Sequence, residues 1–252
     1  MNVMTAIRER VGAVIGAVVF ALICLVGGAA MAFIVSPQQA AEWRRIDNLD
    51  ELTAGSFAAV AAGENVVVTG TIAGEAQGPE GYVFYQRQEW DVERDTDSDG
   101  DTTYDGDWNT IETVYPAFQI QLGDGAVGVA PATSITLSGD LRETITEGSG
   151  GQRASYQGQQ LAEGSIRVRG LATGDVITVL GSKLGDGQLA PDRFHAGDRE
   201  SLVQLIRSNA RVFFWVGVAM MVLSPVVLIM GVVGAIFGRS NRSGGVNIKL
   251  GR

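Results

Sequence analysis

The run with the clearest chemical meaning is Asp95-Thr96-Asp97-Ser98-Asp99-Gly100-Asp101. It matches the opening of a calcium loop, D-x-D-x-D-G, in which alternate carboxylates turn inward and Gly allows a sharp bend. We therefore predict a weak Ca²⁺ site whose ligands are Asp95, Asp97, Asp99 and Asp101.

The run also departs from that motif. Position twelve is Gly106, where the motif places a bidentate Glu, although Asp105 and Asp107 flank it. The flanking residues 90–93 and 109–114 have the texture of strands rather than EF-hand helices. The alternative is a solvated acidic hairpin loop. Terbium luminescence that is unchanged by Asp97→Asn and Asp99→Asn would refute the calcium hypothesis.

Catalytic motifs are missing from the sequence. His195 is the only histidine, so no multi-histidine site can form, and Cys24 is the only cysteine. A thiolate zinc site or an internal disulfide is therefore excluded. The chain has no G-x-S-x-G elbow, no Walker loop and no dinucleotide-binding G-x-G-x-x-G. We interpret the chain as a non-enzyme and expect core packing from its aromatic residues Tyr82, Tyr85, Trp90, Trp108 and Phe118.

Two uncharged apolar runs lie toward the ends of the chain, at residues 11–35 and 212–237. A helix that rises about 1.5 Å per residue needs about 20 residues to cross the hydrocarbon core, so both runs are long enough. The first run could instead be a cleaved signal peptide, because Arg8 and Arg10 precede it and Ala30-Met31-Ala32 offers a cleavage site. A signal h-region is only about 7–15 residues long, which favours a retained anchor.

The charge distribution separates the central region from the ends. Residues 36–211 hold 27 of the 28 acidic residues and 13 of the 19 basic ones. This balance argues against nucleic acid as a partner, since a phosphate-binding surface needs a positive stripe. Residues 238–252 contain basic residues and no acid, so we expect both termini to be cytoplasmic and the central domain to be extracytoplasmic in a cell membrane. A composition rich in Asp and Glu with only two lysines is typical of proteins from salt-adapted cells; the alternative is an ordinary acidic extracytoplasmic domain.

The sequence predicts a membrane-anchored α+β chain in which two transmembrane helices flank a β-rich domain, which is either a sandwich or an OB-like barrel. The predicted division is 1–10 N-terminus, 11–35 first helix, 36–63 helical linker, 64–197 β-rich domain, 198–211 juxtamembrane helix, 212–237 second helix and 238–252 basic tail. The linker helix should begin at Ser36-Pro37, and Asp198 should cap the juxtamembrane helix, which continues into the second span.

About seven strands are expected in the central domain: 66–72, 82–90, 110–122, 126–130, 165–169, 175–181 and 188–190. Gly123-Asp124-Gly125 predicts a hairpin, and residues 139–159 are expected to form a loop with little order. Gly12-x-x-x-Gly16 and Gly234-x-x-x-Gly238 could bring helices close, within the chain or in a homo-oligomer, although such spacings also arise by chance.

The order of these features resembles the GIDE-type, "beside a membrane" domain of mitochondrial membrane-anchored E3 ubiquitin ligases and its ligase-free prokaryotic relatives. The resemblance covers most of the chain and rests on Gly70-Thr71-Ile72, the 82–90 strand, Tyr115-Pro116-Ala117-Phe118 and the run 174–181. The ligases carry a zinc-binding RING after the second span, whereas the 15 residues after it here include neither Cys nor His. The resemblance implies fold and topology but not ubiquitin transfer.

Three functional hypotheses follow. The first is a non-enzymatic two-pass membrane protein that presents an acidic extracytoplasmic domain to a protein partner whose identity the sequence does not reveal. The second is a membrane accessory subunit of a ligase-like or proteolytic system, with the chemistry supplied by a partner. The third is a weak Ca²⁺- or salt-sensing envelope protein.

Overall fold

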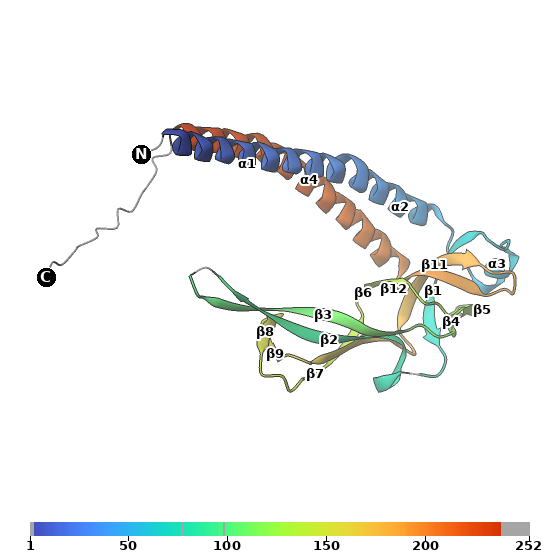
Figure 1. The fold of residues 1–252 in the computed structure, drawn as a ribbon. Coiled ribbons are helices and arrows are strands. Elements are labelled where there is room, and N and C mark those ends of the chain that lie inside the picture. Colours follow the sequence, from blue (N-terminus) through green and yellow to red (C-terminus); the bar gives the residue numbers. More distant parts are fainter. Residues whose placement is uncertain (1–2, 77, 98, 238–252) are drawn as a thin grey trace. The chain divides into compact units, whose positions relative to one another are not determined.

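The computed structural model describes residues 3–76, 78–97 and 99–237 of the chain (Figure 1). It forms two units. The helical unit combines the two ends of the chain, up to Trp43 and from Ile206 onward, and the β-rich unit is Arg44–Leu205. The predicted basic tail, residues 238–252, lies outside the described residues.

The first helical segment runs without a break through α1 (Val3–Ala30), the π-helical turn η1 (Met31–Val35) and α2 (Ser36–Asn48). α2 begins at Ser36 as predicted, but Ser36 itself has helical φ and ψ, so the predicted N-cap there is wrong; the predicted helix after it is confirmed. Pro37 lacks the N–H of a helix interior, and the wider π turn lies directly before it. Instead of capping a helix, the Ser36 hydroxyl donates to the Ala210 carbonyl at 2.9 Å.

The second long helix, α4 (Arg199–Phe237), packs on the first through small residues. A Cβ on Gly28 would lie 2.6 Å from the Gly217 carbonyl oxygen, so the two backbones approach more closely than larger side chains would allow. The Ser224 hydroxyl donates to the Ala21 carbonyl at 2.7 Å.

The predicted Gly-x-x-x-Gly motifs do not make this contact. Gly12, Gly16 and Gly234 have no neighbour within 4 Å of an added Cβ, and Gly238 lies outside the described residues. Their predicted part in a homo-oligomer stays a prediction.

Both helices expose large apolar side chains. In the windows that qualify by length and composition as candidate membrane spans, only 17% of residues are buried in the first helix and 11% in the second. The exposed residues include Ile23, Val26 and Phe33 on the first helix and Trp215, Val222 and Met230 on the second. The chain thus has two long apolar helices that flank a β-rich domain, as predicted.

Five strands of the β-rich unit close into a barrel: β1 (Asn65–Ala73), β4 (Phe118–Leu122), β5 (Gly125–Val129), β11 (Val176–Lys183) and β12 (Leu189–Ala196). The order is β11-β1-β4-β5-β12, and β12 pairs again with β11. Only the β5–β12 pairing, at Val129 and Leu189, is parallel among these five strands. β6 (Thr136–Gly139) adds to β12 in parallel. The barrel core contains Val68, Phe84, Ile120, Ile177 and Phe194, each at most 1% exposed.

A second sheet is built from segments that connect barrel strands along the chain: β2 (Tyr82–Thr96) and β3 (Thr102–Val114) come between β1 and β4, and β7 (Arg142–Thr146) and β10 (Ile166–Ala172) come between β5 and β11. Its order is β3-β2-β10-β7. A separate hairpin pairs β8 (Arg153–Tyr156) with β9 (Gln159–Ala162), and the short helix η2 (Pro79–Gly81) precedes β2.

Two strand predictions are wrong. Residues 139–159 are predicted by the sequence to be a loop with little order but hold β7 and β8. β7 pairs with β10, and because the side chains of both strands are mostly polar, they lack the apolar alternation that marks a strand in a sequence. The predicted strand 110–122 is two strands, interrupted at Tyr115, that belong to different sheets. The predicted hairpin at Gly123-Asp124-Gly125 is confirmed by the β4–β5 pairing.

Short polar contacts fix the ends of the helices. α3 (Ala54–Ala59) begins with a capping box between Thr53 and Ser56, and the Asp124 carboxylate accepts the N–H groups of Ala54 and Gly55. These two backbone hydrogen bonds lower the pKa of the Asp124 carboxyl, and the bond from Gly55 is the larger cause. Lys183 donates to the carbonyls of Ala58 and Val60 where α3 ends.

The predicted cap of α4 is confirmed: Asp198 Oδ1 accepts the Ser201 N–H at 2.8 Å, and this bond is the main cause of the lowered Asp198 pKa. The guanidinium of Arg199 donates to the carbonyls of Ile46 and Asp47 near the end of α2, a role the sequence did not reveal. Leu202 on the predicted apolar face is fully buried, whereas Leu205 is 37% exposed.

Candidate functional site

The outer part of β2 and β3 leaves the second sheet as a two-stranded ribbon. The pairing of β2 with β10 ends at Glu89, opposite Ile166, whereas β2 continues to pair with β3 as far as Thr96 and Thr102. We call residues 90–96 and 102–108 the acidic ribbon. The predicted calcium loop forms its tip, and strands lie on both sides of the loop, as predicted.

Asp97 organises that tip. Its Oδ1 accepts the backbone N–H groups of Asp99 at 3.0 Å and Asp101 at 2.9 Å, and its own N–H donates to the Asp101 carbonyl. Ser98 lies outside the described residues. Among the residues that the structure describes, no group of three His, Cys, Asp or Glu is placed to hold a metal. Calcium binding by Asp95, Asp97, Asp99 and Asp101 stays a prediction.

Carboxylates occupy one face of the acidic ribbon. Asp91 lies opposite Asp107, and Glu93 lies opposite Asp105, with Asp95 next along the same face. Like charges directly opposite one another on a sheet are destabilising. None of the ion pairs within the described part of the chain includes these five carboxylates. This face therefore carries concentrated negative charge, with no ion-pair partner in the part of the chain that the structure describes.

The other face of the ribbon is covered at its base by aromatic rings. Trp90, Trp108 and Tyr156 form a triangle with ring centroids 4.9, 5.6 and 5.5 Å apart. A Cβ on Gly106 would overlap the Trp90 ring, so only Gly fits beneath that indole. Ala154 and Leu161 of the β8–β9 hairpin complete the cluster.

The predicted packing role of the aromatic residues is confirmed for Tyr82, Tyr85, Trp90 and Phe118, each at most 9% exposed. Trp108 packs against the same cluster but is only partly buried. The indole N–H groups of Trp90 and Trp108 are buried and have no hydrogen-bond partner among the described residues.

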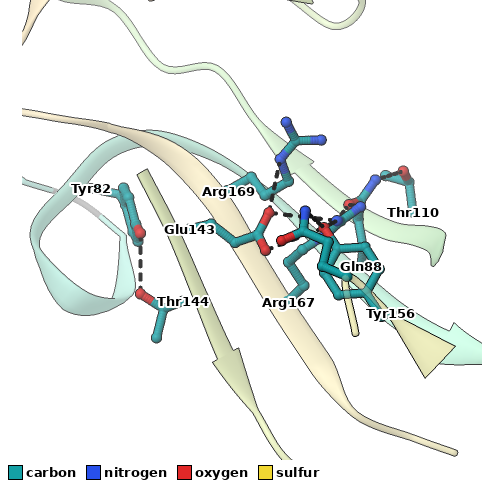
Figure 2. Close-up of polar contacts among 9 residues, drawn as sticks. Tyr82, Gln88, Thr110, Glu143, Thr144, Tyr156, Arg167 and Arg169 are labelled. Carbon is teal, nitrogen blue, oxygen red and sulfur yellow. Dashed lines mark hydrogen bonds and ion pairs between the residues drawn. The ribbon is translucent and has the colours of Figure 1, made fainter. Parts of the chain in front are cut away.

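Arg167 of β10 connects this cluster to the sheet (Figure 2). Its Nε and Nη2 donate to Gln88 Oε1 at 2.8 and 2.6 Å, and its Nη1 donates to the Tyr156 hydroxyl at 2.6 Å. The guanidinium carbon also lies 4.4 Å from the centre of the Trp108 ring, a cation–π contact. Gln88 in turn donates to Thr110 on β3. One buried side chain thus links β10, β2, β3 and the β8–β9 hairpin.

Glu143 of β7 supplies the nearest negative charge. Its Oε2 lies 3.5 Å from Arg167 Nη1 and 3.5 Å from Arg169 Nε, so one carboxylate is shared between two guanidinium groups (Figure 2). Burial lowers the pKa of Arg167, while Tyr156 and Glu143 act in the opposite direction. Within the described residues this network contains neither an activated nucleophile nor an open ligand position; its contacts join the base of the acidic ribbon to the rest of the sheet.

His195 lies in a second polar cluster, at the start of α4. The ring is 2% exposed, with Nδ1 at 3.1 Å from the Ser138 hydroxyl and Nε2 at 2.9 Å from the Ser201 hydroxyl. Ser201 donates its proton to the Asp198 carbonyl at 2.7 Å, so we assign the ring proton to Nε2 and the Nδ1 lone pair to Ser138. Because His195 donates to Ser201, it does not activate that hydroxyl as a nucleophile.

An open hollow of about 390 Å³ lies between the barrel and the segment before α3. Its lining residues are Glu51, Leu52, Thr53, Thr69, Leu122, Gly123 and Asp124. The Asp124 carboxylate in it is already engaged by α3, which leaves Glu51 as its only other acid. This geometry offers no acid–base pair for catalysis.

No protein-family model, no curated protein and no solved structure matches this chain. The resemblance to GIDE-type domains therefore stays an interpretation of short motifs, and the candidate site is argued from its own geometry.

Proposed function

We propose that this protein is a non-enzymatic two-pass membrane protein whose acidic domain binds a protein partner through the acidic ribbon. The observation that carries this proposal is the ribbon itself: an exposed two-stranded arm with uncompensated carboxylates on one face and a buried brace at its base. An exposed element held by such a brace is pre-organised, which lowers the entropy that binding must overcome.

The two apolar helices support the membrane assignment. Their exposed side chains, such as Val26 at 66% and Trp215 at 66%, would be costly in water and are favourable against lipid. The small-residue contact between Gly28 and Gly217 is the kind of packing that joins helices in a bilayer, where no hydrophobic driving force acts between them.

We further propose that the barrel is OB-like. Numbered along the chain, its five strands β1, β4, β5, β11 and β12 close in the order 1-2-3-5-4-1, a Greek-key arrangement of the OB type. In OB-folds the connection between the first two strands commonly takes part in binding, and here that connection contains the acidic ribbon. Its charge favours a basic ligand over the nucleic acids that many OB-folds bind.

The test combines membrane extraction with partner capture. Washing membranes in alkaline carbonate should leave the full-length chain in the pellet, and its mass should include the apolar residues 11–35. A photo-crosslinker at Thr103 should capture a protein partner in intact membranes, and the same probe at Asp192, an exposed position away from the ribbon, should not. Release of the chain by carbonate, or equal capture from both positions, would contradict the proposal. Capture of a ligase-like or protease complex would favour the accessory-subunit alternative.

A further inference from the structure

The alternation of hydrogen bonds in the acidic ribbon leaves one row of backbone groups on β3 free. Trp90 donates its N–H to Ser165 and accepts the N–H of Gly164, so its backbone groups point away from β3. Its partner Trp108 therefore points its own backbone groups away from β2. The same alternation applies at Gly106, Tyr104 and Thr102, because the Asp97–Asp101 bond at the tip keeps the register.

These outward groups form no ladder with a described strand, although β8 packs against β3 near Trp108. β3 is the terminal strand of its sheet, and no backbone hydrogen bond from Thr102, Tyr104, Gly106 or Trp108 to a strand other than β2 occurs within the described residues. Natural sheets usually protect a long edge of this kind, because it is a template for another strand. The carboxylates beside it repel a second copy of the same acidic edge, so the free edge selects against self-association.

We propose that the β3 edge of the acidic ribbon binds an extended basic peptide segment of a partner protein as an added antiparallel strand. This inference rests on the proposed function and specifies its mode. Opposed residues on neighbouring strands share a face, so every second side chain of the peptide lies beside Asp105 and Asp107. The matching peptide carries Lys or Arg at alternate positions and small or β-branched residues between them.

The geometry also fixes which peptide N–H groups are used. In an antiparallel ladder the peptide residues that bond to β3 lie opposite Tyr104 and Gly106, on the face away from the carboxylates. The basic residues lie opposite Asp105 and Asp107, and their N–H groups point to solvent. Methylation of these two sets of peptide nitrogens should therefore have opposite effects.

The experiment uses the full chain in zwitterionic phosphatidylcholine nanodiscs and an acetylated, amidated (Lys-Thr) repeat peptide of about ten residues. We expect measurable binding that weakens with salt, and slower hydrogen exchange at Thr102, Tyr104 and Gly106. N-methylation at the Thr positions should weaken binding at least about tenfold, and N-methylation at the Lys positions should change it less than about twofold.

Two protein variants separate the edge from its charge. Tyr104→Pro removes an outward N–H and should abolish exchange protection, whereas Tyr104→Ala should retain it. Asp105→Asn with Asp107→Asn should weaken binding more than Asp140→Asn with Asp192→Asn, which changes the net charge equally at other exposed positions. Circular dichroism of each variant checks that the sheet is intact.

Several results would overturn the inference: no peptide binding, equal loss with both methylated peptides, the reverse methylation pattern, or exchange protection only outside β3. Each of these would leave the proposed function standing if the crosslinker at Thr103 still captures a partner in membranes. Failure of that capture, in contrast, would contradict the proposed function whatever the peptide does.

Discussion

His195 is nearly fully buried, and both of its ring nitrogens face serine hydroxyls. The sequence identified it as a lone histidine but not its setting, because Ser138 lies 57 residues earlier in the chain. Burial is the main cause that lowers its pKa; the charge of Asp198 acts in the opposite direction and that of Arg193 in the same one. The folded protein therefore holds this ring in its neutral form, as a structural link between β6, β12 and α4.

This setting predicts an acid-sensitive component of stability. In the unfolded chain His195 takes up a proton near pH 6.5, whereas the folded protein resists protonation until lower pH. The contribution of His195 to the free energy of unfolding is therefore fully present above about pH 6.5 and is lost as the pH falls through its folded-state pKa. The melting temperature of the full chain should fall between about pH 7 and 5, and this fall should be smaller in His195→Gln. Parallel pH profiles for the two proteins would contradict the assignment.

At the residue scale, the site was only partly predictable. The Asp-rich run was visible because its signal is local, and the structure places it in a hairpin tip as expected. The sequence did not show that Asp91 pairs with Asp107 and Glu93 with Asp105, because these cross-strand pairs depend on the register of the two strands. Arg167 gave no signal at all, because its partners come from strands far away in sequence.

At the scale of elements, Arg167 and Arg169 form a natural comparison. They lie on the same face of β10, two residues apart, and both approach Glu143 at 3.5 Å. Only Arg167 makes hydrogen bonds to Gln88 and Tyr156 and packs over the Trp108 ring. The attachment of the ribbon and the β8–β9 hairpin to the sheet should therefore depend on Arg167 rather than Arg169.

We expect Arg167→Met to lower the free energy of unfolding by about 2–4 kcal/mol, because it leaves buried polar partners without their donor. Arg169→Met should cost no more than about 1 kcal/mol, since it removes one long ion pair of a partly exposed group. Urea unfolding followed by tryptophan fluorescence measures both, because Trp90 and Trp108 lie in the cluster. Equal losses in the two variants would show that the brace does not depend on this network.

At the scale of the whole molecule, the sequence pattern fixes two long apolar helices with a β-rich domain between them, and the structure has both. The side of the membrane that holds the domain stays a prediction, drawn from a modest charge asymmetry. Because Cys24 is the only cysteine, a Cys24→Ser background allows single-site labelling.

In that background, a membrane-impermeant maleimide should label Thr103→Cys on intact cells and label Ser240→Cys only after permeabilisation. The expected pattern follows from an extracytoplasmic domain and cytoplasmic termini. The reverse pattern would place the acidic domain in the cytoplasm. Labelling of both sites in intact cells would indicate that one of the two helices does not cross the membrane.

The sequence by itself determined the apolar runs, the acid-rich middle, the hairpin at Gly123-Asp124-Gly125 and the cap at Asp198, because each of these is a local pattern. Only the tertiary structure decided the closure of the barrel, the second sheet, the glycines that join the helices and the free edge of β3. Those features depend on which distant strands and helices meet. Short polar strands such as β7 and β8 carry little periodic signal, because pairing rather than burial holds most of their residues.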